Sequence, residues 1–448
     1  MKEFVEVKEN EVENLSKLKE HLGDESTSVA ISFTRQDPRC RYISICSDMN
    51  RMPLNISRAM ANLLFSFHQV MPSYLDFLST FGLQLDQREV RFSGFHEQNT
   101  LSAPQSKKPA VLTLGRSGHG YQLCYNIKAI VDKGGSGKSK NWSKRQAAVH
   151  HQFDVENGKA LWICTEGRKA DGLFDRMRDL TQDNKRMQDW SYSDKQECFR
   201  SSLATHLTCC HWSIEEWRTY MSWLEEVIEN ETRSAIDGNR TRDKGIARKT
   251  YTPQDLMLVQ RYEDQTNEVI TILEANNDVM LSLRTFYAGL MSNDSFDAQL
   301  KLDCKDDVSE FAAQIEDMMY DANMQLRRAR LLVKLTADRK ALVLQHLQSQ
   351  TTEAMTNLTY MSYNEAIIMR IITVVTLIYL PATFVSTFFS TDVVKYQGQE
   401  GQGSFSSIAL YRWLEVTLPL SAITIGAGYA WYRRQKSQSK LKGYILPY

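Results

Sequence analysis

Two apolar runs without a charged residue lie close together near the C-terminal end of this 448-residue chain. The first covers 19 residues, 371–389, and as a helix it would reach about 29 Å, close to the ~30 Å hydrocarbon core of a bilayer. The second, residues 416–432, is at the short end of the spanning range. The alternative is a pair of buried core helices. We expect transmembrane helices at 371–389 and 411–432, joined by an external loop at 390–410.

Composition limits what the rest of the chain can be. The 42% hydrophobic and 24% charged fractions are those of a folded protein. The mean hydropathy of −0.42 excludes a protein made mostly of membrane spans. The 54 basic side chains balance 54 acidic ones, which excludes a surface wholly devoted to nucleic acid.

Charge also predicts topology. The tail at 433–448 carries Arg433, Arg434 and Lys436 and no acidic residue, whereas the loop at 390–410 has little positive charge. Because positive residues stay on the cytoplasmic side, we expect a multi-pass integral membrane protein with both termini in the cytoplasm. The sequence does not indicate which membrane. Anionic lipids are expected to bind the basic tail.

The first apolar run has a mixed stripe along one helix face. From the cytoplasmic end outward, this stripe is formed by Met369, Ile372, Thr376, Leu380, Thr383 and Thr387. The hydroxyl-rich outer part favours a water-facing side, such as a pore lining. Alternatively, each threonine hydroxyl donates to its own helix backbone. In the second run, small residues such as Gly426 and Gly428 would allow close helix packing.

A long helix is predicted to lead into the first span. Residues 306–370 contain neither proline nor glycine, so we expect a stalk helix at 305–370. Apolar residues recur along it at alternating spacings of four and three, at Ile315, Met319, Ala322, Leu326, Ala329 and Val333. A face of this length needs a partner, and we therefore expect a coiled coil and an oligomer.

The remaining chain is predicted to form a cytoplasmic mixed α/β domain at 1–170 and a helical region at 171–304. Strands are expected at 28–33, 42–46, 90–95 and 120–130, and a hairpin at 152–165 that turns at Asn157-Gly158. Residues 55–81 are expected to be helical. In the helical region, Ser213 to Glu216 forms a capping-box pattern, residues 229–250 read as a loop, and Thr252-Pro253 with Asp255 begins the next helix.

Two motifs suggest ligands but are better explained structurally. The glycine-rich stretch 133–139 lacks the first glycine of a phosphate loop, so we expect no nucleotide. His206, Cys209, Cys210 and His211 have zinc-ligand side chains, but without a second cluster a buried helix is the better interpretation. The cysteines are expected to be reduced thiols. We find no catalytic constellation, and therefore expect neither an enzyme nor a bound cofactor.

The C-terminal pattern resembles the CorA family of magnesium transporters. A long helix leads to a span containing Leu380-Pro381-Ala382-Thr383-Phe384, followed by a short loop, a second span and a basic tail. The stretches 120–126 and 151–156 are similar to the divergent fungal CorA-like branch. The resemblance implies a funnel-shaped homopentamer with a cytoplasmic α/β domain, in which the mixed stripe lines a pore for divalent cations. Met369 and Ile372 would then form a hydrophobic constriction, and Leu380 a second one.

One departure from the family affects the pore mouth. The family's Gly-Met-Asn signature, whose Asn holds hydrated magnesium, is replaced by Ser390-Thr391-Asp392. By position, Asp392 would take the role of the metal-binding residue, and a ring of carboxylates suits a hydrated Mg²⁺ ion. Alternatively, Asp392 is a loop residue that caps a helix end. Two hypotheses follow: a passive channel for divalent cations, most readily Mg²⁺, or a non-conducting, membrane-anchored oligomer with a signalling or scaffold role.

Overall fold

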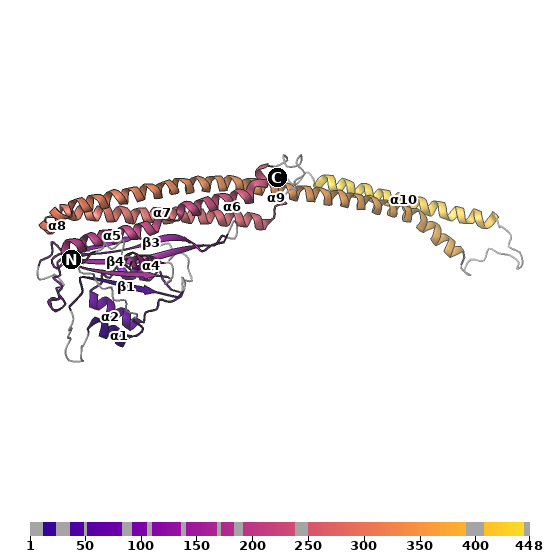
Figure 1. The fold of residues 1–448 in the computed structure, drawn as a ribbon. Helices are drawn as coiled ribbons and strands as arrows, with labels where there is room; N and C mark the ends of the chain where they lie inside the picture. The colour runs from indigo at the N-terminus through magenta and orange to yellow at the C-terminus, as the bar shows by residue number, and fades with distance from the viewer. Residues whose placement is uncertain are drawn as a thin grey trace. The chain divides into compact units, whose positions relative to one another are not determined.

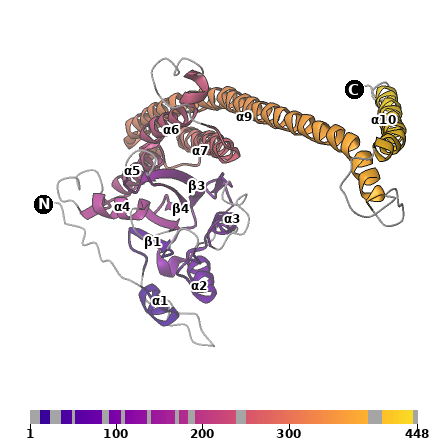
Figure 2. The same cartoon turned by 90° about the vertical axis from the view of Figure 1, so that its right-hand side faces the viewer.

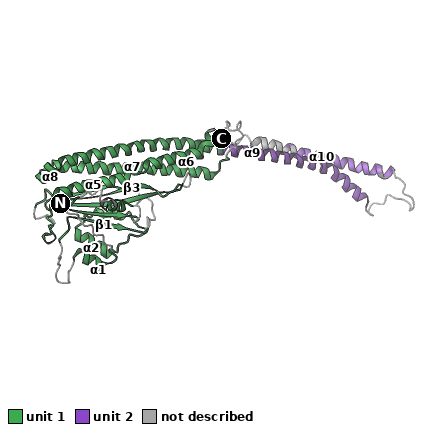
Figure 3. Ribbon diagram, viewed as in Figure 1, with its two compact units in different colours: residues 1–346 green, residues 347–448 purple. Residues whose placement is uncertain are grey.

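The computed structural model describes residues 12–23, 36–48, 52–82, 92–104, 110–135, 140–167, 172–182, 191–237, 250–390 and 407–442. The chain divides into two units, residues 1–346 and 347–448 (Figure 3). The strand expected at 28–33 lies outside the described residues. The boundary between the units falls inside the segment expected to be the stalk.

Unit 1 is built on a five-stranded sheet with the order β1-β5-β4-β3-β2. The strands are β1 (Cys40–Cys46), β2 (Phe95–Asn99), β3 (Gly120–Asp132), β4 (Trp142–Asp154) and β5 (Lys159–Glu166). Strand β1 pairs with β5 in parallel, and the other pairs are antiparallel. The predicted strands at 42–46 and 120–130 are therefore confirmed.

Helices cover both faces of this sheet, as Figures 1 and 2 show. On one face, α1 (Leu15–Leu22), α2 (Arg58–His68) and α3 (Tyr74–Leu78) enclose a smaller core. On the other, α4 (Leu173–Gln182), α5 (Lys195–Ile214), α6 (Trp217–Asp237) and α7 (Pro253–Ser292) enclose a larger one. Alternation along β3 serves both layers, because Leu123 and Tyr125 enter the larger core and Cys124 the smaller. The predicted α/β class thus takes the form of a three-layer arrangement.

The β4–β5 hairpin turns where the sequence predicts, but with a longer loop. Four residues, 155–158, separate the strands, so the two-residue type I′ turn suggested by Asn157-Gly158 is wrong. Asp154 determines this loop, because its Oδ1 accepts the backbone N–H groups of Glu156 and Asn157 at 3.1 and 2.9 Å. Gly158 has φ +61°, the left-handed conformation that favours glycine.

The prediction that 55–81 is helical holds only for α2 and α3, because residues 69–73 between them are not helical. Three further local predictions are wrong. Within 90–95, residues 92–94 are not in a strand, and β2 begins at Phe95. Ser213 does not cap a helix, because it lies inside α5 and its hydroxyl donates to the carbonyl of Cys210 at 2.7 Å. The expected loop at 229–250 begins later, since α6 continues to Asp237; residues 238–249 lie outside the described part of the chain.

The predicted start of α7 is confirmed in detail. The Thr252 side chain accepts the Asp255 N–H, and the Asp255 carboxylate accepts the Thr252 N–H at 2.8 Å. Pro253 occupies the first turn, where its missing N–H is not needed.

Helix α8 (Ala298–Asp303) precedes α9 (Lys305–Phe389), which continues without a break through residues 370 and 371. In unit 1, Ile315, Ala322, Leu326 and Ala329 are buried in the larger core. Salt bridges join α9 to α6 and α7: Arg328 to Glu225 at 2.5 Å, Arg330 to Glu274 at 2.6 Å, and Lys340 to Glu263. The apolar stripe expected to need another copy of the chain is therefore covered within the same chain.

Candidate functional site

Unit 2 contains the last part of α9 and helix α10 (Ser407–Lys442). Among the described residues, α9 alone is long and apolar enough to cross a membrane, with a most apolar window of mean hydropathy 2.0. Helix α10 includes the segment 411–432 expected to be the second span, but it does not meet the same criterion.

One face of α9 packs against α10. Val385 is buried, and the space beside Leu377 is so narrow that a Cβ on Gly428 would lie 3.3 Å from Leu377 Cδ2. The indole N–H of Trp413 donates to Ser386 Oγ at 3.0 Å. Gly428 is therefore a close-packing position as predicted, whereas a Cβ added to Gly426 would meet no other atom within 4 Å.

The predicted pore stripe lies on the opposite face of α9. At 100° per residue, the stripe is centred about 140° from the face of Leu377 and Val385. All six of its residues are exposed in the single chain: Met369, Ile372, Thr376, Leu380, Thr383 and Thr387. Leu380 is the most exposed of its large apolar members, at 70%. The stripe is thus available to other molecules while α10 is in place.

The threonine hydroxyls of the stripe donate to their own helix. Thr376 donates to the carbonyl of Thr373 at 3.0 Å, Thr383 to that of Tyr379 at 3.0 Å, and Thr387 to that of Thr383 at 2.7 Å. This is the alternative that the sequence left open. Because a hydroxyl oxygen has two lone pairs, each threonine can still accept from a hydrated ion.

The predicted pore mouth is described only at its first residue. Ser390 follows the end of α9, and its hydroxyl donates to the Thr387 carbonyl at 2.7 Å. Thr391, Asp392 and the residues that follow them as far as 406 lie outside the described part of the chain. In the tail, Arg433 is exposed; Arg434 and Lys436 lie on α10, with side chains outside the described part.

Sequence reasoning missed Glu365. This carboxylate is exposed, and it lies four and seven residues before Met369 and Ile372, so it belongs to the same helix face. Extending the stripe by one more turn would have found it. Arg370 directly follows Met369 in the sequence, but it lies on the side of the helix that faces away from the stripe.

Of the four zinc-like residues, three form part of the core, whereas His211 is exposed. His206, Cys209 and Cys210 are fully buried in α5, and burial lowers the pKa of His206 to about 3. None of the eight cysteines, all of which lie in the described ranges, forms a disulfide. Within the described ranges, no group of three or more His, Cys, Asp or Glu side chains could hold a metal ion. Of the glycine-rich stretch, residues 136–139 lie outside the described residues.

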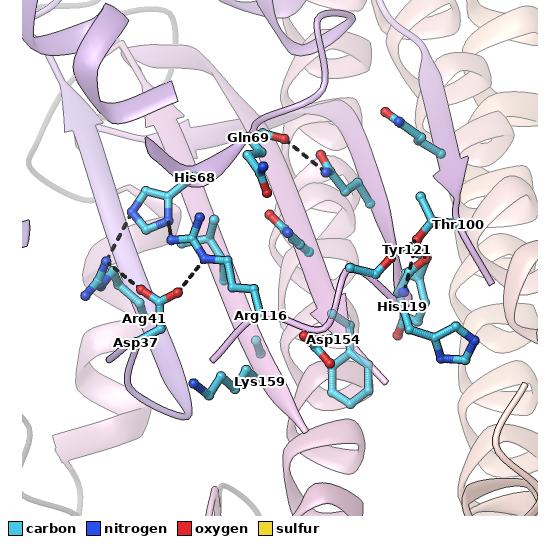
Figure 4. Close-up of a pocket in the computed structure, with 18 of the residues that line it drawn as sticks. Asp37, Arg41, His68, Gln69, Thr100, Arg116, His119, Tyr121, Asp154 and Lys159 are labelled. Carbon is cyan, nitrogen blue, oxygen red and sulfur yellow. Dashed lines mark hydrogen bonds and ion pairs between the residues drawn. The ribbon is translucent and has the colours of Figure 1, made fainter. Parts of the chain in front are cut away.

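Unit 1 contains a pocket of about 70 Å³ that the sequence did not indicate (Figure 4). A charged group at its wall, here called the Arg116 cluster, consists of Asp37, Arg41, His68 and Arg116. Arg116 Nε donates to Asp37 Oδ2 at 2.5 Å, and another of its N–H groups donates to the Phe67 carbonyl. The two nitrogens of His68 lie 3.4 Å from Arg116 and 3.2 Å from Arg41.

The electrostatics of the Arg116 cluster keep His68 neutral. Burial is the main cause that lowers the pKa of His68 well below its ordinary value, and the charges of Arg41 and Arg116 lower it further. Both arginine side chains are largely buried, with 13% and 9% of their surface exposed. The cluster therefore places two guanidinium groups around one carboxylate.

A family model described as CorA-like transporters matches residues 2–236. The solved full-length CmaX protein is 12% identical, over 70% of this chain and 74% of CmaX, with a TM-score of 0.24. The ZntB cytoplasmic domain from Vibrio parahaemolyticus RIMD 2210633 is 9% identical, over 72% of this chain and 93% of that domain, with a TM-score of 0.34. Neither similarity supports a further inference. No curated protein matches the chain.

Proposed function

The chain belongs to the CorA-like transporters, and on that premise we propose that it passes divalent cations, Mg²⁺ foremost, through an oligomeric membrane pore. Flux is passive, and an inside-negative membrane potential draws the cations inward. Helix α9 lines the pore. The part of the chain that precedes the membrane-spanning segment of α9 lies in the cytoplasm, together with both termini.

The exposed stripe on α9 carries this proposal. Helix α10 covers the face of Leu377 and Val385, which leaves the stripe from Met369 to Thr387 to face a central axis when copies of α9 assemble. Its outer part offers hydroxyl oxygens to a hydrated ion. Its inner part offers rings of Met369 and Ile372, and apolar rings of this kind can gate a pore by dewetting.

Acidic side chains at both ends of the stripe would attract cations. Asp392 follows α9 at the external mouth, and Glu365 lies on the stripe's face at the cytoplasmic end. Mg²⁺ dehydrates reluctantly and keeps several of its waters. A ring of carboxylates that contacts this ion through its water shell is therefore a workable replacement for the family's ring of amides.

Assembly is proposed to be a homopentamer, as in the family that the sequence resembles. From residue 351 to residue 376, every residue of α9 is exposed in the single chain. Large apolar side chains among them include Met355, Leu358 and Met361, and an exposed apolar surface of this extent marks an interaction site. Anionic lipids are proposed to bind the tail at Arg433, Arg434 and Lys436.

A second candidate function rests on the missing Gly-Met-Asn signature. With Ser390, Thr391 and Asp392 in its place, the chain would form a membrane-anchored oligomer that does not conduct and has a signalling or scaffold role.

Uptake into proteoliposomes separates the two functions. Full-length protein is reconstituted, an inside-negative potential is imposed, and Mg²⁺ uptake is followed for wild type, Asp392→Asn and Asp392→Ala. Uptake that changes in rate or selectivity when Asp392 is replaced supports the pore. Ile378→Val, a change on the side of the same helix away from the stripe, is the control and should leave uptake unaltered. If correctly assembled wild type carries neither Mg²⁺ nor Ni²⁺ nor Co²⁺, the non-conducting function is the better one.

A further inference from the structure

The Arg116 cluster has one hydrogen-bond donor too many. Neutral imidazole has one N–H and one acceptor nitrogen, yet both nitrogens of His68 face guanidinium groups, at 3.2 and 3.4 Å. Only one of these two contacts can therefore be a hydrogen bond. The other sets an N–H group against an N–H group. An added acceptor at this wall of the pocket would resolve the conflict.

The pocket also has an excess of positive charge. Among the described lining residues, the cations are Arg41, Arg116 and Lys159, and the anions are Asp37 and Asp154. Asp37 is shared between the two arginines, with its Oδ1 lying 3.5 Å from Arg41. Lys159 Nζ donates to a neutral group, the Leu114 carbonyl, at 3.1 Å. A partly buried ammonium group that faces only a neutral carbonyl is costly, so the pocket favours an anionic ligand.

Asp154 does not oppose this charge with free acceptor atoms. Its Oδ2 accepts the Ser117 N–H at 2.7 Å, and its Oδ1 accepts the Ser117 hydroxyl at 2.8 Å together with the two N–H groups of the β4–β5 loop. The carboxylate is therefore committed to holding that loop.

We propose that the pocket beside Arg116 and Lys159 binds a small free oxyanion of the phosphate class. The planar guanidinium fork suits the paired oxygens of such an anion. A volume of about 70 Å³ holds several water-sized molecules, and thus a single tetrahedral oxyanion, but not a nucleotide. The Arg116 cluster and Lys159 come from four segments: β1 with the stretch before it, the end of α2, the stretch before β3 and the start of β5.

The test is titration of the full-length protein in detergent with inorganic phosphate, at constant ionic strength set by sodium chloride. Wild type should show saturable binding at one site per chain. Arg116→Gln and Lys159→Gln should each weaken binding by about tenfold or more, because each removes a charged hydrogen-bond donor. Arg328→Gln, which removes an arginine paired with Glu225 on α6, is the matched control and should bind phosphate as wild type does.

Several results would overturn the site. They are the absence of saturable binding by wild type, equal binding by the pocket variants, and competition by adenosine triphosphate that is tighter than phosphate itself. If Arg116→Gln fails to fold, Lys159→Gln decides, because the half-buried Lys159 makes fewer contacts. Binding is read without transport, so this result is independent of whether the chain conducts cations.

Discussion

Glu166 should make the stability of unit 1 depend on pH near neutrality. It is the last residue of β5 and is 4% exposed. Its carboxylate accepts the backbone N–H groups of Leu173 and Phe174, at the start of α4, at 3.0 and 2.6 Å. Burial nevertheless raises its pKa from 4.5 to about 7, and the nearby charge of Asp175 adds to the rise.

The sign follows from proton binding. Between pH 4.5 and about 7, the folded chain holds a proton on Glu166 that the unfolded chain has lost. The contribution of Glu166 to stability is therefore largest below pH 4.5, falls as pH rises to about 7, and then levels off. This difference between the folded and unfolded pKa values of Glu166 lowers the free energy of unfolding by about 3 kcal/mol.

The perturbation is Glu166→Gln, which cannot ionise. Unfolding of the full-length chain by urea in detergent would be followed by tryptophan fluorescence at pH 5, 6, 7 and 8. We expect the variant to lack the part of the pH dependence assigned to Glu166. Between pH 5 and pH 8, its free energy of unfolding should therefore rise by about 3 kcal/mol relative to that of wild type. Glu226→Gln, at an exposed position on α6, should follow wild type. Parallel curves for wild type and Glu166→Gln would refute the reasoning.

Two further substitutions test packing, each with a matched control on the same helix. Asn276→Ala should destabilise unit 1 by about 2–4 kcal/mol in the same urea assay, because the Asn276 amide hydrogen-bonds to both backbone groups of Lys128 at 3.1 and 2.8 Å in the core. The control, Asn267→Ala at an exposed position, should lower the free energy of unfolding by less than about 0.5 kcal/mol. Equal losses of stability in the two variants would contradict the prediction. Gly428→Leu should separate α9 from α10 and lower the yield of a disulfide engineered between the two helices. Gly426→Leu, at a position with open space, should leave that yield unchanged. An unchanged disulfide yield for Gly428→Leu would show that the close approach of the helices is unimportant.

Sequence patterns predicted features whose partners lie within a few residues of one another. The cap at Thr252 and Asp255 is such a case, since both hydrogen bonds close within one helical turn. The same kind of pattern was wrong at Ser213, because the chain there was already helical and the hydroxyl found the carbonyl of Cys210. A capping motif thus identifies a helix start only where the preceding residues are not helical.

Features that depend on distant parts of the chain were not predictable in this way. The periodic stripe of Ile315 to Ala329 was recognised, but its partners, α6 and α7, could not be read from spacing alone. The residues of the Arg116 cluster come from segments separated by whole elements, and no local motif joins them. The face of α9 from Met369 to Thr387 could be drawn from sequence because a single helix fixes its geometry.

The burial of six of the eight thiols makes this chain suited to chemical mapping of its membrane helices. All eight cysteines precede residue 305, so residues 347–448 contain none. Burial raises the pKa of Cys124, Cys198, Cys209 and Cys304 to about 12, and a thiol that remains protonated reacts slowly with maleimides. Once the half-buried Cys40 and Cys46 are replaced, a cysteine introduced along α9 would therefore be labelled against a low background from the six buried thiols. Labelling rates read position by position would then report directly which side of this helix meets water.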